Sequence, residues 1–243
     1  MRLAINIEYD GTAYYGWQRQ QFLPTVQEQV EIALSEIAAE KISIVCAGRT
    51  DTGVHAFGQV AHFDTNANRS LDAWLRGGNA ILPQDIRIMQ VREVTSDFHA
   101  RYSARARHYR YVIYNSDVAP ALLRHRTMWH KYPLDELSMQ KAIPYLLGEH
   151  DFSSFRGAGC QSKSTIRNIS SLDVIRQGGI INIDIAANAF LLHMVRNIVG
   201  ILIKIGSGAQ SPIWAQEVLL ARDRKKAAIT APAHGLYLVK VVY

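Results

Sequence analysis

Residues 42–63 read ISIVCAGRTDTGVHAFGQVAHF, a polar, glycine-bounded loop between two apolar runs. The runs at 42–46 and 59–63 predict two strands, with the loop between them at the mouth of a sheet. Outward in both directions, apolar residues alternate with polar ones in further short segments, which is typical of half-buried strands. These further strands are expected at 3–9, 86–94, 107–114, 167–175, 180–187 and 236–242.

Five helices are expected between the strands. Thr25 with Glu28 three residues later has the pattern of a capping box, and an apolar stripe follows it. The other helices are expected from Ser70 to Gly77-Gly78, over 135–147 with a kink or early end at Pro144, over 190–205 and over 212–222. Interleaved helices and strands with hairpin-like neighbours predict an α+β or mixed α/β protein with a largely antiparallel sheet. A soft boundary near residue 103 gives halves at 1–103 and 104–243, with no proline- or glycine-rich linker.

The composition favours a polyanionic partner. The 243 residues include 27 Lys and Arg against 21 Asp and Glu, a formal charge of +6, and the isoelectric point is near 9.4. Two isolated cysteines without CxxC, and nine histidines without HExxH, predict no metal site. Glu8 and Asp10 come too early for a secretory signal, and the apolar stretch 198–203 is far short of the roughly 20 residues that span a bilayer. We therefore expect a soluble, cytoplasmic protein with no membrane segment.

The loop between the first two strands holds the strongest candidate for chemistry. Asp51 lies in GRTDTGVH, where flanking glycines allow a backbone or a ligand to approach closely. Arg49 is two residues away, so in extended backbone both side chains point the same way and the guanidinium favours an ionised carboxylate. An ionised carboxylate can act as a nucleophile without a separate base. The alternative from spacing alone is that Asp51 caps a turn and Arg49 forms a surface ion pair.

A second candidate is the basic and aromatic segment 101–111, RYSARARHYRY. In a strand that starts near residue 105, one face presents Arg105, Arg107, Tyr109 and Tyr111. Arginine beside tyrosine provides a phosphate contact and a stacking surface for an unpaired base. The alternative is a half-buried strand with core tyrosines and solvated arginines.

Arg196 is a third candidate, because it lies in the otherwise apolar helix expected over 190–205. A buried guanidinium needs a partner, since an unpaired buried charge costs several kcal/mol. A carboxylate in a cleft, such as Asp51, would serve. The alternative is that Arg196 extends along its apolar stem to the surface.

Together these segments resemble the tRNA pseudouridine synthase A family over nearly the whole chain. Six blocks match in order, namely IEYDGTAYYGWQRQ, AGRTDTGVHAFGQVAHF, DFHARYSARARHYRYVIYN, DFSSFR, NAFLLHMVRNIVG and GLYLVKVVY. The resemblance implies an isomerase without metal or small-molecule cofactor that converts uridine to pseudouridine at positions 38, 39 and 40 of the tRNA anticodon stem-loop. It also implies two α+β halves with ferredoxin-like elements, a shared sheet and a central active-site cleft. The family works as a homodimer in which a tRNA contacts both subunits.

The same resemblance implies roles for individual residues. Asp51 matches the catalytic aspartate, Arg49 the arginine of the same motif, and Arg196 the arginine that pairs with the catalytic carboxylate. Tyr109 matches the tyrosine that packs on the target base, and Leu236 matches an apolar residue that lines the uracil pocket. Two other classes of protein stay open: a non-catalytic RNA-binding or folding factor, and a hydrolase with a carboxylate nucleophile that would release free uracil.

Overall fold

The chain divides into two compact units in the computed structural model, which describes residues 1–243. The first unit is Met1–Arg105 together with Tyr237–Tyr243, and the second is Ala106–Leu236. The boundary expected near residue 103 assigns the final strand to the second half. In the structure, the residues of that strand from Tyr237 onward belong to the first unit and extend its sheet.

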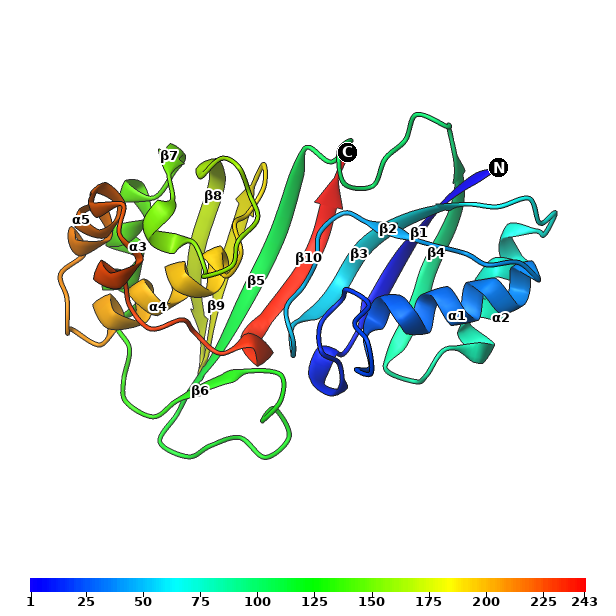
Figure 1. The fold of residues 1–243 in the computed structure, drawn as a ribbon. Helices are drawn as coiled ribbons and strands as arrows, with labels where there is room; N and C mark the ends of the chain where they lie inside the picture. The colour runs from blue at the N-terminus through cyan, green and yellow to red at the C-terminus, as the bar shows by residue number, and fades with distance from the viewer. The chain divides into compact units, whose positions relative to one another are not determined.

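The sheet of the first unit has the strand order β4-β1-β3-β10 (Figure 1). Strand β1 (Arg2–Tyr9) is central and pairs antiparallel with β3 (His55–Asp64) and with β4 (Ile86–Val94). Strand β10 (Leu236–Val242) pairs in parallel with β3, and the short β2 (Val45–Cys46) pairs antiparallel with it. Leu3, Ile5, Ile7 and Tyr9 alternate along one face of β1 and are all buried, which explains why the sequence pattern predicted a strand.

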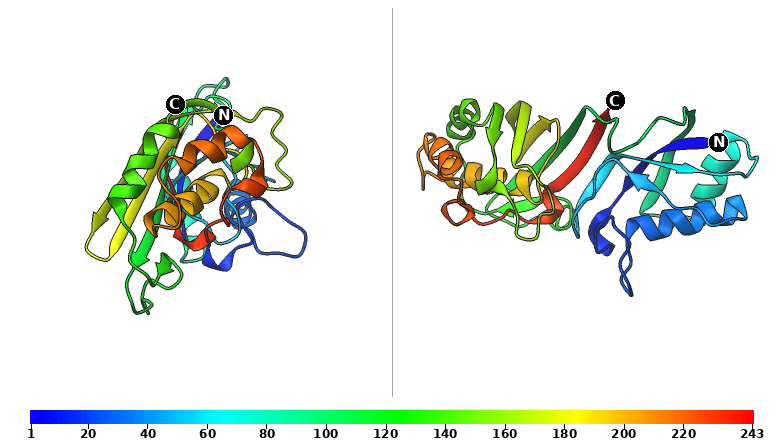
Figure 2. Two further views of the ribbon diagram at one scale, coloured as in Figure 1. Left: turned by 90° about the vertical axis from the view of Figure 1, so that its left-hand side faces the viewer. Right: turned by 45° about the horizontal axis from the view of Figure 1, so that its top comes forward.

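Two helices cover this sheet. Helix α1 (Val26–Ala38) and helix α2 (Leu71–Ile81) lie side by side, as the right-hand view of Figure 2 also shows. Trp74 of α2 is fully buried and meets Phe63 of β3 edge-on, with ring centroids 5.2 Å apart. The apolar faces of α1 and α2 therefore form the core of the first unit with one face of its sheet.

The second unit has the strand order β5-β9-β8-β7, with every neighbouring pair antiparallel. The strands are β5 (Ala106–Asn115), β9 (Ile180–Ala187), β8 (Ile166–Gln177) and β7 (Gly148–Asp151), and β6 (Met128–His130) pairs in parallel with β5. The hairpin expected around Gly178 is confirmed. Gly178 has a left-handed φ of 59°, which explains why a glycine stands at this turn. The α+β class with a largely antiparallel sheet is confirmed.

The helices of the second unit are α3 (Glu136–Ala142), α4 (Met194–Gly206) and α5 (Trp214–Ala221). Helix α3 ends at Ala142, and a 3₁₀ turn over Ile143–Tyr145 follows, so the early end predicted at Pro144 is confirmed. Helix α4 packs against α3 and contacts β5, and it is buried on nearly all sides. No helix in the structure is both long and apolar enough to cross a bilayer.

The capping box predicted at the start of α1 is wrong, although the helix begins where expected. The Thr25 side chain makes no capping hydrogen bond, and its Oγ1 is buried without a partner. The carbonyls of Gly16 and Trp17 instead accept the N–H groups of Val26 and Gln27, at 3.2 and 2.9 Å. These contacts satisfy the helix terminus with distant backbone, so no side-chain cap is needed.

The strand predicted at 42–46 is wrong for most of its length, since β2 is only Val45–Cys46. Ile42 and Ile44 are buried, which explains the apolar pattern. Their N–H groups donate to side chains of α1, to Ser35 Oγ at 2.9 Å and to Glu31 Oε1 at 3.0 Å. Helix side chains therefore replace the sheet ladder that the pattern suggested.

Two predicted helix ends are also wrong. Helix α2 continues past Gly77-Gly78 to Ile81, because Gly78 allows close packing: a Cβ there would lie 2.7 Å from Cδ1 of Ile88 on β4. Helix α4 begins at Met194 rather than at residue 190, because His193 has a left-handed φ of 61° that no α-helix continues. Neither cause is visible in local sequence periodicity.

Candidate active site

The loop before β3 carries Asp51, and its backbone is fixed on both sides of that residue. Thr50 is buried, with its Oγ1 2.7 Å from the Tyr9 hydroxyl oxygen at the end of β1. The Thr50 carbonyl accepts a hydrogen bond of 3.0 Å from the Trp17 N–H, and the Asp51 carbonyl accepts one of 3.1 Å from the Val54 N–H. The loop therefore holds the partly buried Asp51 on a backbone with little freedom.

Two glycines allow residues 11–17 to touch this loop directly. Gly16 has a φ of 87°, and a Cβ there would lie 2.8 Å from the Thr50 carbonyl oxygen. A Cβ at Gly11 would lie only 2.0 Å from the Val54 carbonyl oxygen. Both clashes are with backbone atoms, which cannot rotate away as a side chain can. The two glycines are thus required for the loop that holds Asp51.

We expect Gly11→Ala to displace this loop and to destabilise the first unit by at least about 1–3 kcal/mol, the usual cost of overpacking. Thermal unfolding should show a decrease of about 2–4 °C for each kcal/mol in a chain of this size. The matched control is Gly77→Ala, where the nearest side-chain atom to the new Cβ would be 3.4 Å away. A Gly11→Ala protein that unfolds at the wild-type temperature would contradict the proposed close contact.

His55 connects the start of β3 to the turn at residues 10–11. Its ring is buried, and Nδ1 lies 3.0 Å from the Gly11 backbone nitrogen and 3.1 Å from Oδ1 of Asp10. The Asp10 carboxylate also accepts from the Thr12 N–H at 3.0 Å. This network explains how the two segments next to Asp51 are held together, and it gives His55 a positioning role.

Arg49 does not pair with Asp51 in the structure. The Arg49 side chain is exposed, and the structure gives it no hydrogen bond or ion pair. Its charge acts on the Cys46 thiol, but burial outweighs this effect and raises the pKa of Cys46 to about 11. The thiol is therefore protonated near neutral pH, so Cys46 is a poor nucleophile and Asp51 stays the stronger candidate.

In the second unit, β5 presents Arg107, Tyr109 and Tyr111 on one buried face, as the strand pattern predicted. Arg107 is 9% exposed and donates from Nη1 to the Asn188 carbonyl at 2.8 Å, so it is not the solvated arginine of the alternative interpretation. Tyr109 meets Phe190 edge-on, with centroids 5.0 Å apart. Arg105 is exposed, precedes the strand and belongs to the first unit.

Arg196 lies in the first turn of α4 and is partly buried. Its Nε donates to the Ala231 carbonyl at 2.7 Å, and the Ala231 N–H donates back to the Arg196 carbonyl at 3.2 Å. The Tyr111 hydroxyl donates to the neighbouring Pro232 carbonyl at 2.8 Å. Burial raises the pKa of Tyr111 well above its usual range, and the Arg196 guanidinium opposes that shift. The guanidinium is thus aimed by backbone contacts beside Tyr111.

Leu236 follows the same segment at the start of β10 and is 6% exposed. The preceding Gly235 packs on the Tyr111 ring, since a Cβ there would lie 2.7 Å from Cζ. The second unit therefore gathers Arg196 and the start of β10 around Tyr111, and Tyr109 lies on the same face of β5.

Comparison with known proteins shows what this chain is related to. A family model described as tRNA pseudouridine synthase matches residues 5–103 and 142–243. The chain belongs to the tRNA pseudouridine synthase family. The tRNA pseudouridine synthase A of Coxiella burnetii (strain Dugway 5J108-111) is 56% identical over 242 residues, covering 100% of this chain and 93% of the relative. That of Legionella pneumophila (strain Lens) is 54% identical over 243 residues with the same coverage.

Two solved structures of Cbf5 complexes show a distant likeness to this chain. The crystal structure of a Cbf5-Nop10-Gar1 complex aligns with 97% of this chain and 48% of that chain, at 11% identity and a TM-score of 0.41. This likeness carries no argument about the site. The expected family and enzyme class are nevertheless confirmed by the family model and the relatives: the synthase is an isomerase that makes pseudouridine in tRNA.

The sequence did not identify every residue that shapes the synthase site. Gly11, Gly16 and His55 act through contacts between segments about forty residues apart, and Ala231 acts on Arg196 through its carbonyl. The only local signal is the Asp10-Gly11 pair, which has the composition of a turn. Long-range backbone contacts of this kind leave no periodic pattern.

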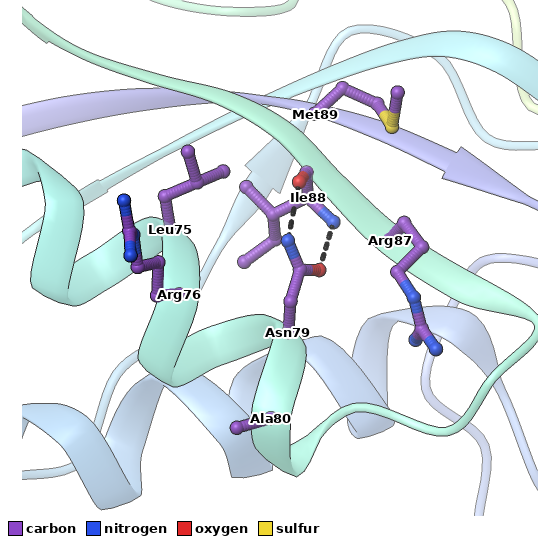
Figure 3. Close-up of a pocket in the computed structure, with 7 residues that line it drawn as sticks. All are labelled: Leu75, Arg76, Asn79, Ala80, Arg87, Ile88 and Met89. Atoms are coloured by element: carbon purple, nitrogen blue, oxygen red, sulfur yellow. Dashed lines mark hydrogen bonds between the residues drawn. The ribbon is translucent and has the colours of Figure 1, made fainter.

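A hollow of about 590 Å³ in the first unit of the synthase is lined by none of the predicted site residues (Figure 3). It is formed by α2 and β4, with Arg76, Arg87 and Met89 among its lining residues. Asn79 exchanges two hydrogen bonds with the Ile88 backbone there, at 2.7 and 2.8 Å. These bonds satisfy the outer edge of β4, which explains the local structure without a ligand.

Nowhere in the chain do three or more His, Cys, Asp or Glu side chains gather as possible metal ligands.

Proposed function

We propose that this synthase acts on uridines 38, 39 and 40 of the tRNA anticodon stem-loop, with Asp51 as the nucleophile. The proposal includes a homodimer that works in the cytoplasm and contacts tRNA with both subunits. The observation that carries it is the fixed backbone on either side of Asp51, through the Thr50 and Val54 contacts. A carboxylate that must attack a sugar or a base needs such preorganisation, because misplacement of about 1 Å can cost 100-fold in rate.

The reaction rearranges bonds within one nucleotide. The N1–C1′ bond breaks, a C5–C1′ bond forms, C5 loses a proton to solvent and N1 gains one. Asp51 attacks either C1′ of the ribose or C6 of the uracil, and both routes use the same carboxylate. The balance requires neither an oxidant nor a reductant.

The second unit supplies the remaining groups in this proposal. Arg196, aimed by the Ala231 carbonyl, pairs with the Asp51 carboxylate, and Arg49 adds positive charge to the same loop. Tyr109 packs on the target base, and it or a group near it accepts the C5 proton. Leu236 lines the uracil pocket.

The two arginines beside β5 have different roles in this proposal. Exposed Arg105 is available to contact tRNA phosphate, which is how arginine supplies much of the affinity for nucleic acid. Arg107 is held in place by its hydrogen bond to the Asn188 carbonyl, and in this proposal its guanidinium also contributes to substrate binding.

The test uses an unmodified tRNA with tritium at uracil C5, in which uridine is present at only one of the three positions at a time. We expect each single-uridine tRNA to release tritium to water, because C5 loses its proton when it bonds to C1′. The matched control has cytidine at all three positions and should release none. Product analysis should find pseudouridine and no free uracil.

Other outcomes would change the proposal in specific ways. Release from the tRNA without these uridines would show that the target positions are wrong. Free uracil would indicate hydrolysis. Binding without any release would favour the non-catalytic RNA-binding alternative. Sedimentation should give twice the mass of one chain, and a monomer would remove the dimer from the proposal.

A further inference from the structure

Strand β3 has a β-bulge six residues after Asp51. Its register with β1 moves from Ile7 opposite Gln59 to Tyr9 opposite Ala56, so one residue of β1 faces both Phe57 and Gly58. Bulges of this kind redirect a side chain and are common next to active sites.

Gly58 makes the bulge possible where β10 passes. A Cβ at Gly58 would lie 2.5 Å from the Val239 carbonyl oxygen of β10. The glycine thus lets the two backbones approach, and the bulged residue before it is free to point outward.

Three aromatic rings form a continuous stack on this face. His55 stacks on Tyr237 of β10, with centroids 4.8 Å apart and planes at 26°. Tyr237 in turn stacks on Phe57, at 5.1 Å and 12°. Exposure increases along the stack, from 2% for His55 to 9% for Tyr237 and 53% for Phe57. One face of the Phe57 ring is covered by Tyr237, and about half of the residue's surface stays exposed to solvent.

The core does not account for this exposed ring. Phe57 is a large apolar side chain at the outer end of a rigid stack, so its ring is ordered before any partner arrives. The inner end, His55, contacts the Gly11 backbone that supports the Asp51 loop. Six residues of chain span at most about 20 Å, so Phe57 lies within that distance of the proposed nucleophile.

We propose that Phe57 is a stacking platform for an unpaired base of the tRNA next to the target uridine. The inference deepens the proposed function and rests on its tRNA substrate. Removing a uridine from its stack exposes the faces of the neighbouring bases, which costs free energy. An exposed aromatic ring at the end of a preordered stack replaces one lost stacking partner, and it does so for any base because every base has a π face.

An unpaired base fits this ring better than a phosphate or a second copy of the chain. The Phe57 side chain carries no charge and no hydrogen-bonding group, so it cannot bind a phosphate. A flat ring with one open face matches a base in area and shape, whereas the contact surface of a stable dimer is far larger than a single ring. The net charge of +6 agrees with a nucleic-acid partner.

The test compares Phe57→Ala, Phe57→Leu and Phe57→Trp in the full-length protein, with an anticodon stem-loop RNA and with whole tRNA. We expect Phe57→Ala to weaken binding about 5- to 20-fold, the lower part of the range for losing one base–aromatic stack. Phe57→Leu should be nearly as weak, and Phe57→Trp should bind at least as well as wild type. The matched control is Ile32→Ala on α1, where the side chain is 52% exposed, and it should bind like wild type.

The salt dependence separates stacking from charge. Stacking releases no counterions, so the slope of log K against log salt should be the same for wild type and Phe57→Ala, whereas the loss of one phosphate contact lowers it by about 1. Tritium release should show a higher KM with kcat changed less than threefold. Phe57→Trp should also change in fluorescence when the stem-loop binds, by more than the wild-type protein does.

Three results would overturn the platform. The first is an RNA affinity of Phe57→Ala within twofold of wild type, and the second is an RNA affinity of Phe57→Leu equal to wild type. The third is a change in the sedimenting mass of Phe57→Ala, which would place Phe57 between two copies of the chain. Each is distinct from failure of the proposed function, because that would appear in the wild-type protein itself, as lost tritium release or as release from the tRNA that lacks the three uridines. Thermal unfolding of each variant checks that the fold is intact.

Discussion

Asp51→Ala and Asp51→Asn are expected to stop pseudouridine formation while leaving tRNA binding intact. Removing a nucleophile typically costs about 10⁴-fold or more in rate, because no other group can form the covalent intermediate. Phosphate contacts by Lys and Arg supply most of the affinity for nucleic acid, and neither variant alters them. Removing a negative charge from a surface that meets RNA should leave binding equal or slightly tighter.

The measurements are tritium release from C5-labelled tRNA and direct tRNA binding at one fixed salt concentration. Thr52→Ala is the matched control, because its side chain is exposed in the same loop and no contact in the structure depends on it. It should retain wild-type turnover. If Asp51→Asn still releases tritium at more than about a thousandth of the wild-type rate, Asp51 is not the nucleophile.

The strands were predictable wherever one face is buried and the other solvated. Strands β4 and β10 begin and end at the predicted residues, and the alternating burial of β5 follows its alternating sequence. The segment at 42–46 shows where this reasoning stops. Ile42 and Ile44 are buried, but side chains of α1 bind their backbone, and the pattern cannot distinguish that arrangement from a sheet.

The candidate site shows the same division. A single loop predicted Asp51 as a candidate, and a single strand predicted that Tyr109 lies on the same face of β5 as Tyr111, since each signal lies within about ten residues of sequence. The clamp on the Asp51 loop and the Phe57 bulge depend on contacts between different strands, through Gly11 and β10. Such contacts follow from tertiary structure, and local sequence patterns do not encode them.

Arg196→Lys is expected to lower kcat by about 100-fold or more with a much smaller change in KM. In the proposed function Arg196 directs the Asp51 carboxylate, and misplacement of a reacting group by about 1 Å can cost about 100-fold in rate. Arg196 donates from Nε to the Ala231 carbonyl, and this hydrogen bond fixes the orientation of the guanidinium and its terminal nitrogens. Lysine has one point charge and no planar fork, so it cannot keep both the backbone contact and the direction of the charge.

Tyr111→Phe is the control that separates charge from local packing. It removes the hydrogen bond to the Pro232 carbonyl, next to the carbonyl that binds Arg196, but leaves the guanidinium in place. We expect Tyr111→Phe to keep most of its kcat. Arg196→Ala should regain part of its activity when a low concentration of guanidinium is added, since the small cation can occupy the vacated position. Equal losses in Arg196→Lys and Tyr111→Phe, with no rescue, would mean that Arg196 only supports the 231–232 segment and takes no part in directing Asp51.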